Sequence, residues 1–277
     1  MKFVDTSLAR RLEAAEEVPQ IEIARVLQRV NPEIGADILA IAGGHAVFAG
    51  LNSPVGRAIG LGLDSPVTAA QLDEVEAFYK QHNAPSQVDI TPVTHGSLLE
   101  LLKTRGYVMT ELNNVMARRL EPYERFEENA LGCEFRACTP EDVQLWTHTM
   151  LCGFFPEDQI PAGWDYLLAP MAQVPNALAM LVWVDGKPVA CCGGLIVREH
   201  RMVMLGGTST LPAYRGRTPP NKACTSPVTP SGTKELQRSL DAFGYKLPCY
   251  TSAAYEYVPG SCHGLAYHVL NASTIEQ

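Results

Sequence analysis

Three apolar runs of strand length follow one another in the second half of the chain. Ala177–Val184 and Val189–Val197 flank Asp185-Gly186, a dipeptide typical of a tight hairpin turn. A third run, Met202–Ser209, follows a second polar turn. This pattern predicts a three-stranded antiparallel meander.

A helix is predicted upstream of the meander. Thr139 suits an N-cap and Pro140 a first helical position, and acidic residues follow in the first turn. An apolar stripe then recurs at helical spacing at Val143, Trp146, Met150 and Leu151. We expect this helix to end at Gly153, a strand before it at Cys133–Cys138, and a second helix after it at about Trp164–Gln173.

The first half of the chain carries a comparable series of elements. Thr68 and Gln71 form a capping box that opens a helix running through Tyr79. The other elements expected there are strands at Ala36–Ala42, Gly44–Ala49, Arg57–Leu63 and Ser86–Thr91, a helix at Gly96–Thr104, and strands from Gly106 to Leu120. The sequence therefore predicts an α/β (α+β) protein with a mixed, mostly antiparallel sheet flanked by helices, in two similar halves.

Composition adds limits on partners. The chain has 277 residues, of which 46% are hydrophobic and 19% are charged, which is typical of a soluble globular protein. It contains no apolar run of membrane-spanning length and no secretory signal pattern, so we expect a cytoplasmic protein without a membrane partner. Its net charge of −8 and the lack of a Lys/Arg block argue against nucleic acid.

The cysteines predict neither disulfides nor a metal site. There are 8 of them, and their spacing follows no disulfide framework. Cys191 and Cys192 lie within an apolar strand, where cysteine behaves as a small hydrophobe. The soft ligands near the end of the chain match no closed zinc pattern; these are Cys249, Cys262, His263 and His268.

The meander leads into a turn of distinctive sequence, Leu211-Pro-Ala-Tyr-Arg-Gly-Arg217. Together with the order of elements before it, this turn resembles the acetyl-CoA-binding core of the GNAT N-acetyltransferase superfamily over residues 133–217. In that superfamily the last meander strand splays from its neighbour and exposes backbone amides to the pantetheine arm, and the turn holds the pyrophosphate. The resemblance implies acetyl-CoA as co-substrate, an arm lined by Thr208, Ser209 and Thr210, and a diphosphate bound by Arg215, Gly216 and Arg217.

The resemblance also implies a domain organisation. Residues 1–120 are expected to form a degenerate acetyltransferase-like domain, 121–132 a linker, and 133–277 an acetyl-CoA-binding domain disrupted from 218 on. In the first half, Asp64–Thr68 stands where the phosphate-binding turn belongs. That half is therefore expected to be structural.

The sequence departs from the superfamily directly after Arg217. The glycine of its motif falls at Thr218 and the following small residue at Pro220, and proline has no N–H to offer a phosphate. Prolines further on exclude a long helix over residues 218–231, which leaves a short one at 233–243. So abrupt a change indicates, as one hypothesis, an altered reading frame or a degraded gene.

Three functional hypotheses follow from the resemblance. The chain is an N-acetyltransferase acting on a small-molecule or peptide amine, an inactive binding or scaffold protein of the same fold, or a frame-disrupted remnant. The superfamily uses direct attack of a neutral amine on the thioester. Glu199, Tyr267 and His148 are candidate proton carriers, but their positions favour a solvated turn residue, a core tyrosine and an isolated helix histidine, so the sequence assigns no catalytic residue. The acceptor and the oligomeric state are unspecified.

Overall fold

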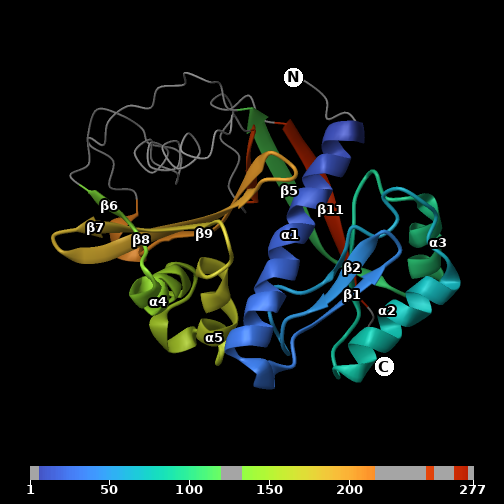
Figure 1. Cartoon of the computed structure of the whole chain (residues 1–277), viewed down its shortest axis with the longest axis horizontal. Coiled ribbons are helices and arrows are strands. Elements are labelled where there is room, and N and C mark those ends of the chain that lie inside the picture. Colours follow the sequence, from blue (N-terminus) through green and yellow to red (C-terminus); the bar gives the residue numbers. More distant parts are fainter. Residues whose placement is uncertain (1–5, 120–132, 216–247, 253–264, 274–277) are drawn as a thin grey trace. The chain divides into compact units, whose positions relative to one another are not determined.

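A computed structural model describes residues 6–119, 133–215, 248–252 and 265–273 (Figure 1). Internal contacts divide the chain into two units. The first contains residues 1–116, 252–254 and 263–277, and the second contains residues 117–251 and 255–262. The functional domain ranges expected from the sequence, 1–120, 121–132 and 133–277, stay a prediction.

The first unit builds a mixed sheet in the strand order β1-β2-β3-β4-β11-β5. Its elements are α1 (Thr6–Val30), β1 (Asp37–Ile41), β2 (Gly44–Phe48), β3 (Ala58–Ile59), α2 (Ala69–Gln81), β4 (Gln87–Ile90), α3 (Gly96–Thr104), β5 (Val108–Arg119) and β11 (Leu265–Ser273). β3 and β4 are parallel and β11 is antiparallel to β4, with Leu270 opposite Ile90. A strand from the far end of the chain therefore completes this sheet.

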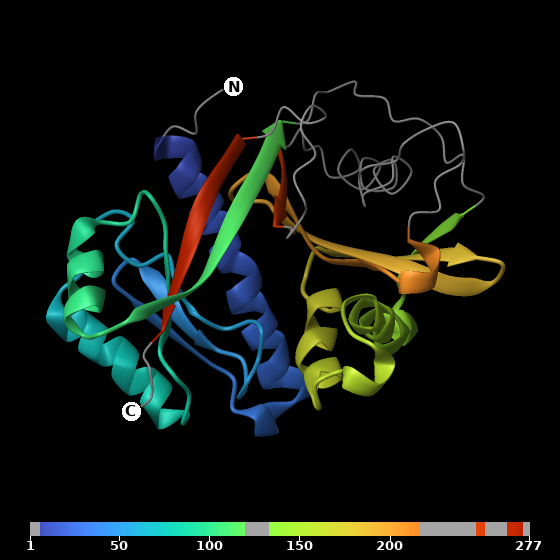
Figure 2. The same cartoon turned by 180° about the vertical axis from the view of Figure 1, so that it is seen from behind.

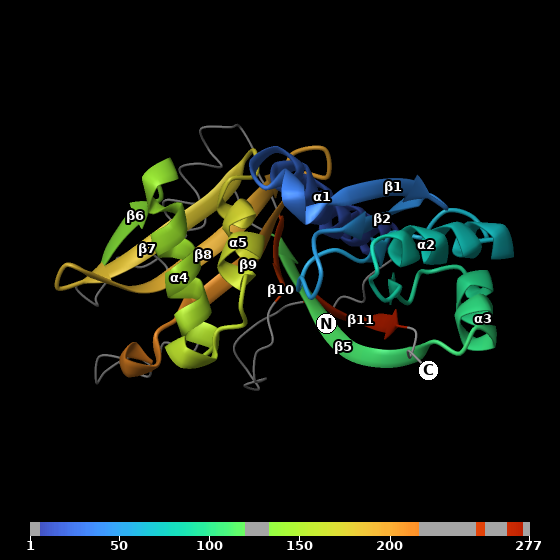
Figure 3. The same cartoon turned by 90° about the horizontal axis from the view of Figure 1, so that it is seen from below.

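Helices cover both faces of the first sheet. On β2, Ala46 and Phe48 join a core cluster with residues of α2 and α3, whereas Val47 points to the opposite face, where α1 packs (Figure 3). Val47 is fully buried as well. The expected capping box of α2 is confirmed, since Thr68 Oγ1 accepts a hydrogen bond from Gln71 N and Gln71 Oε1 accepts one from Thr68 N.

The second unit has the strand order β10-β9-β8-β7-β6. Its elements are β6 (Glu134–Ala137), α4 (Val143–Phe154), α5 (Trp164–Leu168), β7 (Ala177–Val184), β8 (Lys187–Val197), β9 (Met202–Thr210) and β10 (Pro248–Ser252). All neighbouring pairs are antiparallel except β9 with β10. Figures 1 and 2 show α4 and α5 on the same face of this sheet. The predicted order of strand, two helices and meander is confirmed.

The hairpin turn between β7 and β8 follows from the backbone conformation of its two residues. Asp185 and Gly186 both have positive φ, at 50° and 73°, which is the geometry of the two-residue turn that matches strand twist. The second helix is shorter than expected, since α5 ends at Leu168 and a 3-10 turn, Ala169–Ala172, follows. Pro170 has no N–H to continue an α-helical hydrogen-bond series.

Two details of the helix predicted upstream of the meander are corrected. It opens with a 3-10 turn at Pro140–Asp142, and α4 proper begins at Val143. It also continues past Gly153 to Phe154. Gly153 is needed for close packing, because a Cβ there would collide with the side chain of Ser209.

The predictions for residues 218–231 and 233–243 lie outside the described residues. None of the described helices is long and apolar enough to cross a membrane.

α4 lies close against β8 and β9 because glycines leave room for its tryptophan. Trp146 is 1% exposed, and its indole N–H donates to Cys192 O at 3.1 Å. A Cβ added to Gly193 would lie 2.8 Å from Trp146 Cζ2, and one added to Gly207 would lie 3.0 Å from Trp146 Cη2. Trp146 thus fixes the distance between helix and sheet.

β9 contains a β-bulge next to this contact. Cys191 lies opposite Ser209 and Gly193 lies opposite Gly206, so β9 carries one residue more than β8 over this stretch. Gly207 lies within the extra length and has a φ of 65°, in the left-handed region. Only glycine reaches that conformation at low cost.

We expect Gly207→Ala to lower the free energy of unfolding by about 1–2 kcal/mol, because an L-residue is strained at this φ. Its new methyl group would also press on Trp146 and Met150. Gly206→Ala is the matched control, since a Cβ at Gly206 meets nothing within 4 Å. Urea unfolding of both variants measures the difference. Equal stability of the two variants would contradict the role given to the bulge.

Candidate functional site

β9 extends beyond its pairing with β10. β10 pairs with Val203–Leu205 only, whereas β9 runs on to Thr210. Leu211 N donates to Val189 O at 2.9 Å, so the backbone groups of Leu211 face β8. By strand alternation, the N–H and C=O of Thr210 face the other edge. Within the described residues, β9 therefore presents a stretch of edge that β10 does not cover.

Thr208, Ser209 and Thr210, the predicted lining of the pantetheine arm, lie on this stretch in two orientations. Ser209 is 8% exposed, and its hydroxyl donates to Thr149 O of α4 at 3.2 Å. Its side chain therefore anchors the helix, and its backbone groups face β8, as those of Leu211 do. Thr208 and Thr210 are half-buried.

Arg215, predicted to meet the diphosphate, folds back along the end of β9. Its Nε donates to Thr210 O at 2.9 Å, and one terminal nitrogen donates to Gly153 O in the last turn of α4. A cation at the C-terminal end of a helix interacts favourably with the helix dipole. The guanidinium thus links α4 to the turn after β9. Gly216 and Arg217 lie outside the described residues.

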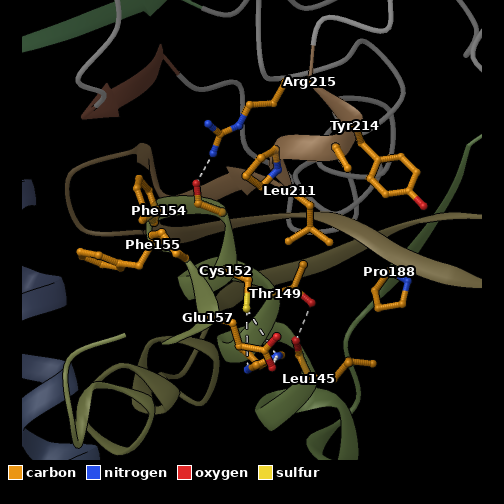
Figure 4. A pocket seen from close by; sticks show the side chains of 15 residues that line it. Leu145, Thr149, Cys152, Phe154, Phe155, Glu157, Pro188, Leu211, Tyr214 and Arg215 are labelled. Atoms are coloured by element: carbon orange, nitrogen blue, oxygen red, sulfur yellow. Dashed lines mark hydrogen bonds and ion pairs between the residues drawn. The ribbon is translucent and has the colours of Figure 1, made fainter. Parts of the chain in front are cut away.

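A cavity of about 670 Å³ opens between α4 and this turn (Figure 4). It is lined mainly by carbon, and its walls include Leu145, Phe154, Pro188, Leu211, Tyr214 and Arg215. Its volume lies in the range usual for small-molecule sites. The residues that build it belong to the helix, the start of β8 and the turn that the sequence assigns to the cofactor.

Three groups with acid–base or nucleophilic chemistry also line this cavity. Cys152 Sγ lies 3.4 Å from His148 Nε2, and His148 Nε2 lies 3.6 Å from Glu157 Oε1. His148 is therefore not the isolated histidine that the sequence suggests, because Cys152 and Glu157 lie beside it. The signal for the pair was present in the sequence, because residues four apart on a helix are neighbours.

Four other cysteines are described, of which Cys191 is buried and Cys133, Cys138 and Cys192 are half-buried. Burial raises the pKa of Cys191 to about 11, and that of Cys192 and Cys138 to about 12. All three are thus protonated at neutral pH. Cys152 is half-buried, and its pKa is raised by burial and by the charge of Glu157.

The remaining candidates lie elsewhere. Glu199 is an exposed residue of the turn between β8 and β9, as preferred from the sequence. Tyr267 lies on β11, in the sheet of the first unit. No cluster of three or more potential metal ligands occurs among the described residues. His263 and the side chains of Cys249 and His268 lie outside that description.

Comparison with known proteins identifies the fold. No protein-family model and no curated protein matches the chain. Among solved structures, a GCN5-related N-acetyltransferase from Kribbella flavida matches with a TM-score of 0.60 at 11% identity, over 92% of this chain and 96% of that one. A tandem GNAT protein from the clavulanic acid biosynthesis pathway matches with a TM-score of 0.50 at 10% identity, over 83% and 78%.

A protein of unknown function from Bacteroides thetaiotaomicron also matches, with a TM-score of 0.51 at 11% identity over 98% of each chain. The chain therefore has the fold of the GNAT N-acetyltransferase superfamily, with a mixed α+β architecture. The expected fold class is confirmed.

We expect Arg215→Ala to lower the free energy of unfolding by about 1 kcal/mol, because two backbone carbonyls lose a charged donor. Arg198→Ala is the control, since Arg198 bonds the side chain of Asn176 at an exposed turn, and we expect a change within about 0.5 kcal/mol. Urea denaturation measures both variants. If Arg215→Ala is no less stable than Arg198→Ala, Arg215 does not link α4 to the turn.

Proposed function

We propose that the second unit binds acetyl-CoA and transfers its acetyl group to an amine of a small molecule or peptide, in the cytoplasm. The observation that carries this proposal is the edge of β9 beyond Leu205, which β10 does not cover. The similarity of the whole fold to a GCN5-related N-acetyltransferase also supports the proposal.

The part of the β9 edge that β10 does not cover suits a pantetheine arm. Backbone N–H and C=O groups need hydrogen-bond partners, and a strand edge binds an extended chain by offering them. A pantetheine arm carries two amides and is extended, so it can pair with such an edge. Thr210 supplies a backbone N–H that faces away from β8, and its C=O on the same edge accepts from Arg215 Nε.

Arg215 is less directly available for binding a diphosphate. It lies at the end of the same strand, but its guanidinium already bonds two carbonyls. Hydrogen bonds from a guanidinium to an anion are about twice as strong as those between neutral groups. A diphosphate would therefore compete with the neutral carbonyls for these donors.

In the proposed reaction, the co-substrate and the protein make different contributions. Acetyl-CoA supplies an activated acetyl thioester. The chain's own contribution is a cavity with carbon-rich walls, including Leu145, Phe154 and Leu211, beside the turn that follows β9.

An inactive binding or scaffold protein of the same fold is the second candidate. It is favoured by the engagement of Arg215 with carbonyls and by the prolines that follow Arg217. This candidate predicts a stable fold that acetyl-CoA does not stabilise.

Acetyl-CoA is expected to raise the thermal unfolding midpoint, because a ligand at 100 times its dissociation constant adds about 2.7 kcal/mol to the folded state. S-acetyl-pantetheine, which lacks the diphosphate, is expected to give a smaller shift. Arg215→Ala should reduce the shift with acetyl-CoA but not with S-acetyl-pantetheine, and Arg198→Ala should change neither.

The same samples test transfer, by following thiol release in the presence of a panel of polyamines and peptides with free amines. No shift with millimolar acetyl-CoA, for a protein that unfolds cooperatively, would reject the enzyme and favour the inactive protein. A shift without thiol release for any amine would leave a binding protein.

A further inference from the structure

The part of the β9 edge beyond β10 has one of its backbone groups already bonded. The N–H and C=O of Thr210 both face away from β8, because the N–H of the next residue, Leu211, donates to Val189 O. Thr210 C=O accepts a hydrogen bond from Arg215 Nε at 2.9 Å. In the free protein this edge therefore offers a ligand the N–H of Thr210, while the neighbouring acceptor is taken by an arginine.

The Arg215 side chain holds a second carbonyl at the same time. A 3-10 turn at Pro212–Tyr214 reverses the chain after β9, and one terminal nitrogen of Arg215 donates to Gly153 O in the last turn of α4, as Figure 4 shows. The donors of a guanidinium lie in one rigid plane, so a single placement of the side chain makes both bonds. The C-terminal end of a helix also favours a cation. Arg215 is thus held at the end of the strand edge.

An extended amide ligand needs both backbone groups of Thr210. A chain that pairs with a strand edge accepts a hydrogen bond from an N–H and donates one to a C=O. A carbonyl oxygen can accept two hydrogen bonds, but here the guanidinium lies beside it and extends on to Gly153 O. A ligand that pairs fully with this edge must therefore displace Arg215 from Thr210 C=O.

We propose that Arg215 is a specificity residue, which closes this edge in the free protein and opens it for thioesters that carry a diphosphate. The inference rests on the proposed function, because it takes the edge as the site of the pantetheine arm. Hydrogen bonds from a guanidinium to phosphate are stronger than those to neutral carbonyls, so a diphosphate beside the turn draws Arg215 away. The released Thr210 C=O then accepts from an amide of the arm.

The same contacts work against thioesters that lack a diphosphate. Such a ligand breaks the bonds of Arg215 to Thr210 O and Gly153 O and gives the guanidinium no anion in return. Its apparent affinity falls by the fraction of molecules in which the edge is open. Arg215 therefore raises the affinity for one class of thioester and lowers the affinity for the other.

The test compares two ligands on the full chain by calorimetric titration. Arg215→Ala should weaken acetyl-CoA by about tenfold, because charged hydrogen bonds to the diphosphate are lost. The same change should tighten S-acetyl-pantetheine by about fivefold, because Thr210 C=O becomes free. The two dissociation constants thus move in opposite directions. A residue that only maintains the shape of the site would weaken both ligands when replaced.

Two further variants separate charge from closure. Arg215→Lys keeps the positive charge but lacks the planar fork, so we expect it to retain more affinity for acetyl-CoA than Arg215→Ala does and still to bind S-acetyl-pantetheine more tightly than the unmodified chain. Arg198→Ala is the control, because Arg198 bonds Asn176 at an exposed turn, and it should change neither constant. Unfolding midpoints confirm that the variants are folded.

A second measurement detects the coupling itself. Inorganic pyrophosphate, added separately, should draw Arg215 from the edge and strengthen the binding of S-acetyl-pantetheine to the unmodified chain by up to about fivefold. By linkage, S-acetyl-pantetheine should strengthen the binding of pyrophosphate by the same factor. In Arg215→Ala the two ligands should bind independently.

The outcomes distinguish the inference from the proposed function. If acetyl-CoA binds, but Arg215→Ala fails to tighten S-acetyl-pantetheine or pyrophosphate gives no coupling, Arg215 does not close the edge and the proposed function stands. If S-acetyl-pantetheine binds more tightly after Arg215→Ala while acetyl-CoA binds to neither chain, closure is supported and acetyl-CoA as co-substrate is contradicted. Binding of neither ligand to either chain rejects both.

Discussion

The contact of Trp146 with the glycine backbone of β8 and β9 is the constraint on which the candidate site depends. The indole fills the space that Gly193 and Gly207 leave, and it donates a hydrogen bond to the backbone of β8. This contact sets the height of α4 above the sheet. Ser209 and Gly153 then meet, and Arg215 reaches the last turn of the helix. The cavity wall with His148 and Cys152 is the flank of the same helix.

The bulge in β9 belongs to this arrangement. With Gly207 in the left-handed region, the strand gains one residue relative to β8 and continues beyond its described pairing with β10. In the part of the chain that the structure describes, local backbone geometry thus places a strand edge beyond β10 and a cavity beside one turn.

The parts of the fold specified by local signals were predictable from the sequence. Asp185-Gly186 dictates its hairpin through positive φ, and the capping boxes at Thr68 and Thr139 open their helices. Helix α1 was not predicted, although it buries an apolar stripe that includes Leu12 and Leu27, and Pro19 lies inside it. The pairing of β11 with β4 joins residues far apart in the chain, and no local pattern encodes such a pairing.

The candidate site also has parts that the sequence predicts and parts that it does not. Thr208, Thr210 and Arg215 were found through a motif, and the structure places them at one strand end. The burial of Ser209 against α4 depends on the bulge, which shifts the register by one residue and has no clear sequence signal. Cys152 and His148 are one turn apart within α4, whereas Glu157 follows the helix, so only its approach to His148 requires the helix to end where it does.

Hydrogen exchange at the amide of Thr210, measured with and without acetyl-CoA, tests the central claim most directly. The claim is that the edge of β9 beyond Leu205 receives the ligand. It predicts fast exchange of Thr210 N–H in the free protein and protection by acetyl-CoA, with little change at Leu211, whose N–H already bonds Val189 O. Unchanged exchange at Thr210 under conditions where acetyl-CoA binds would place the ligand elsewhere and contradict the account.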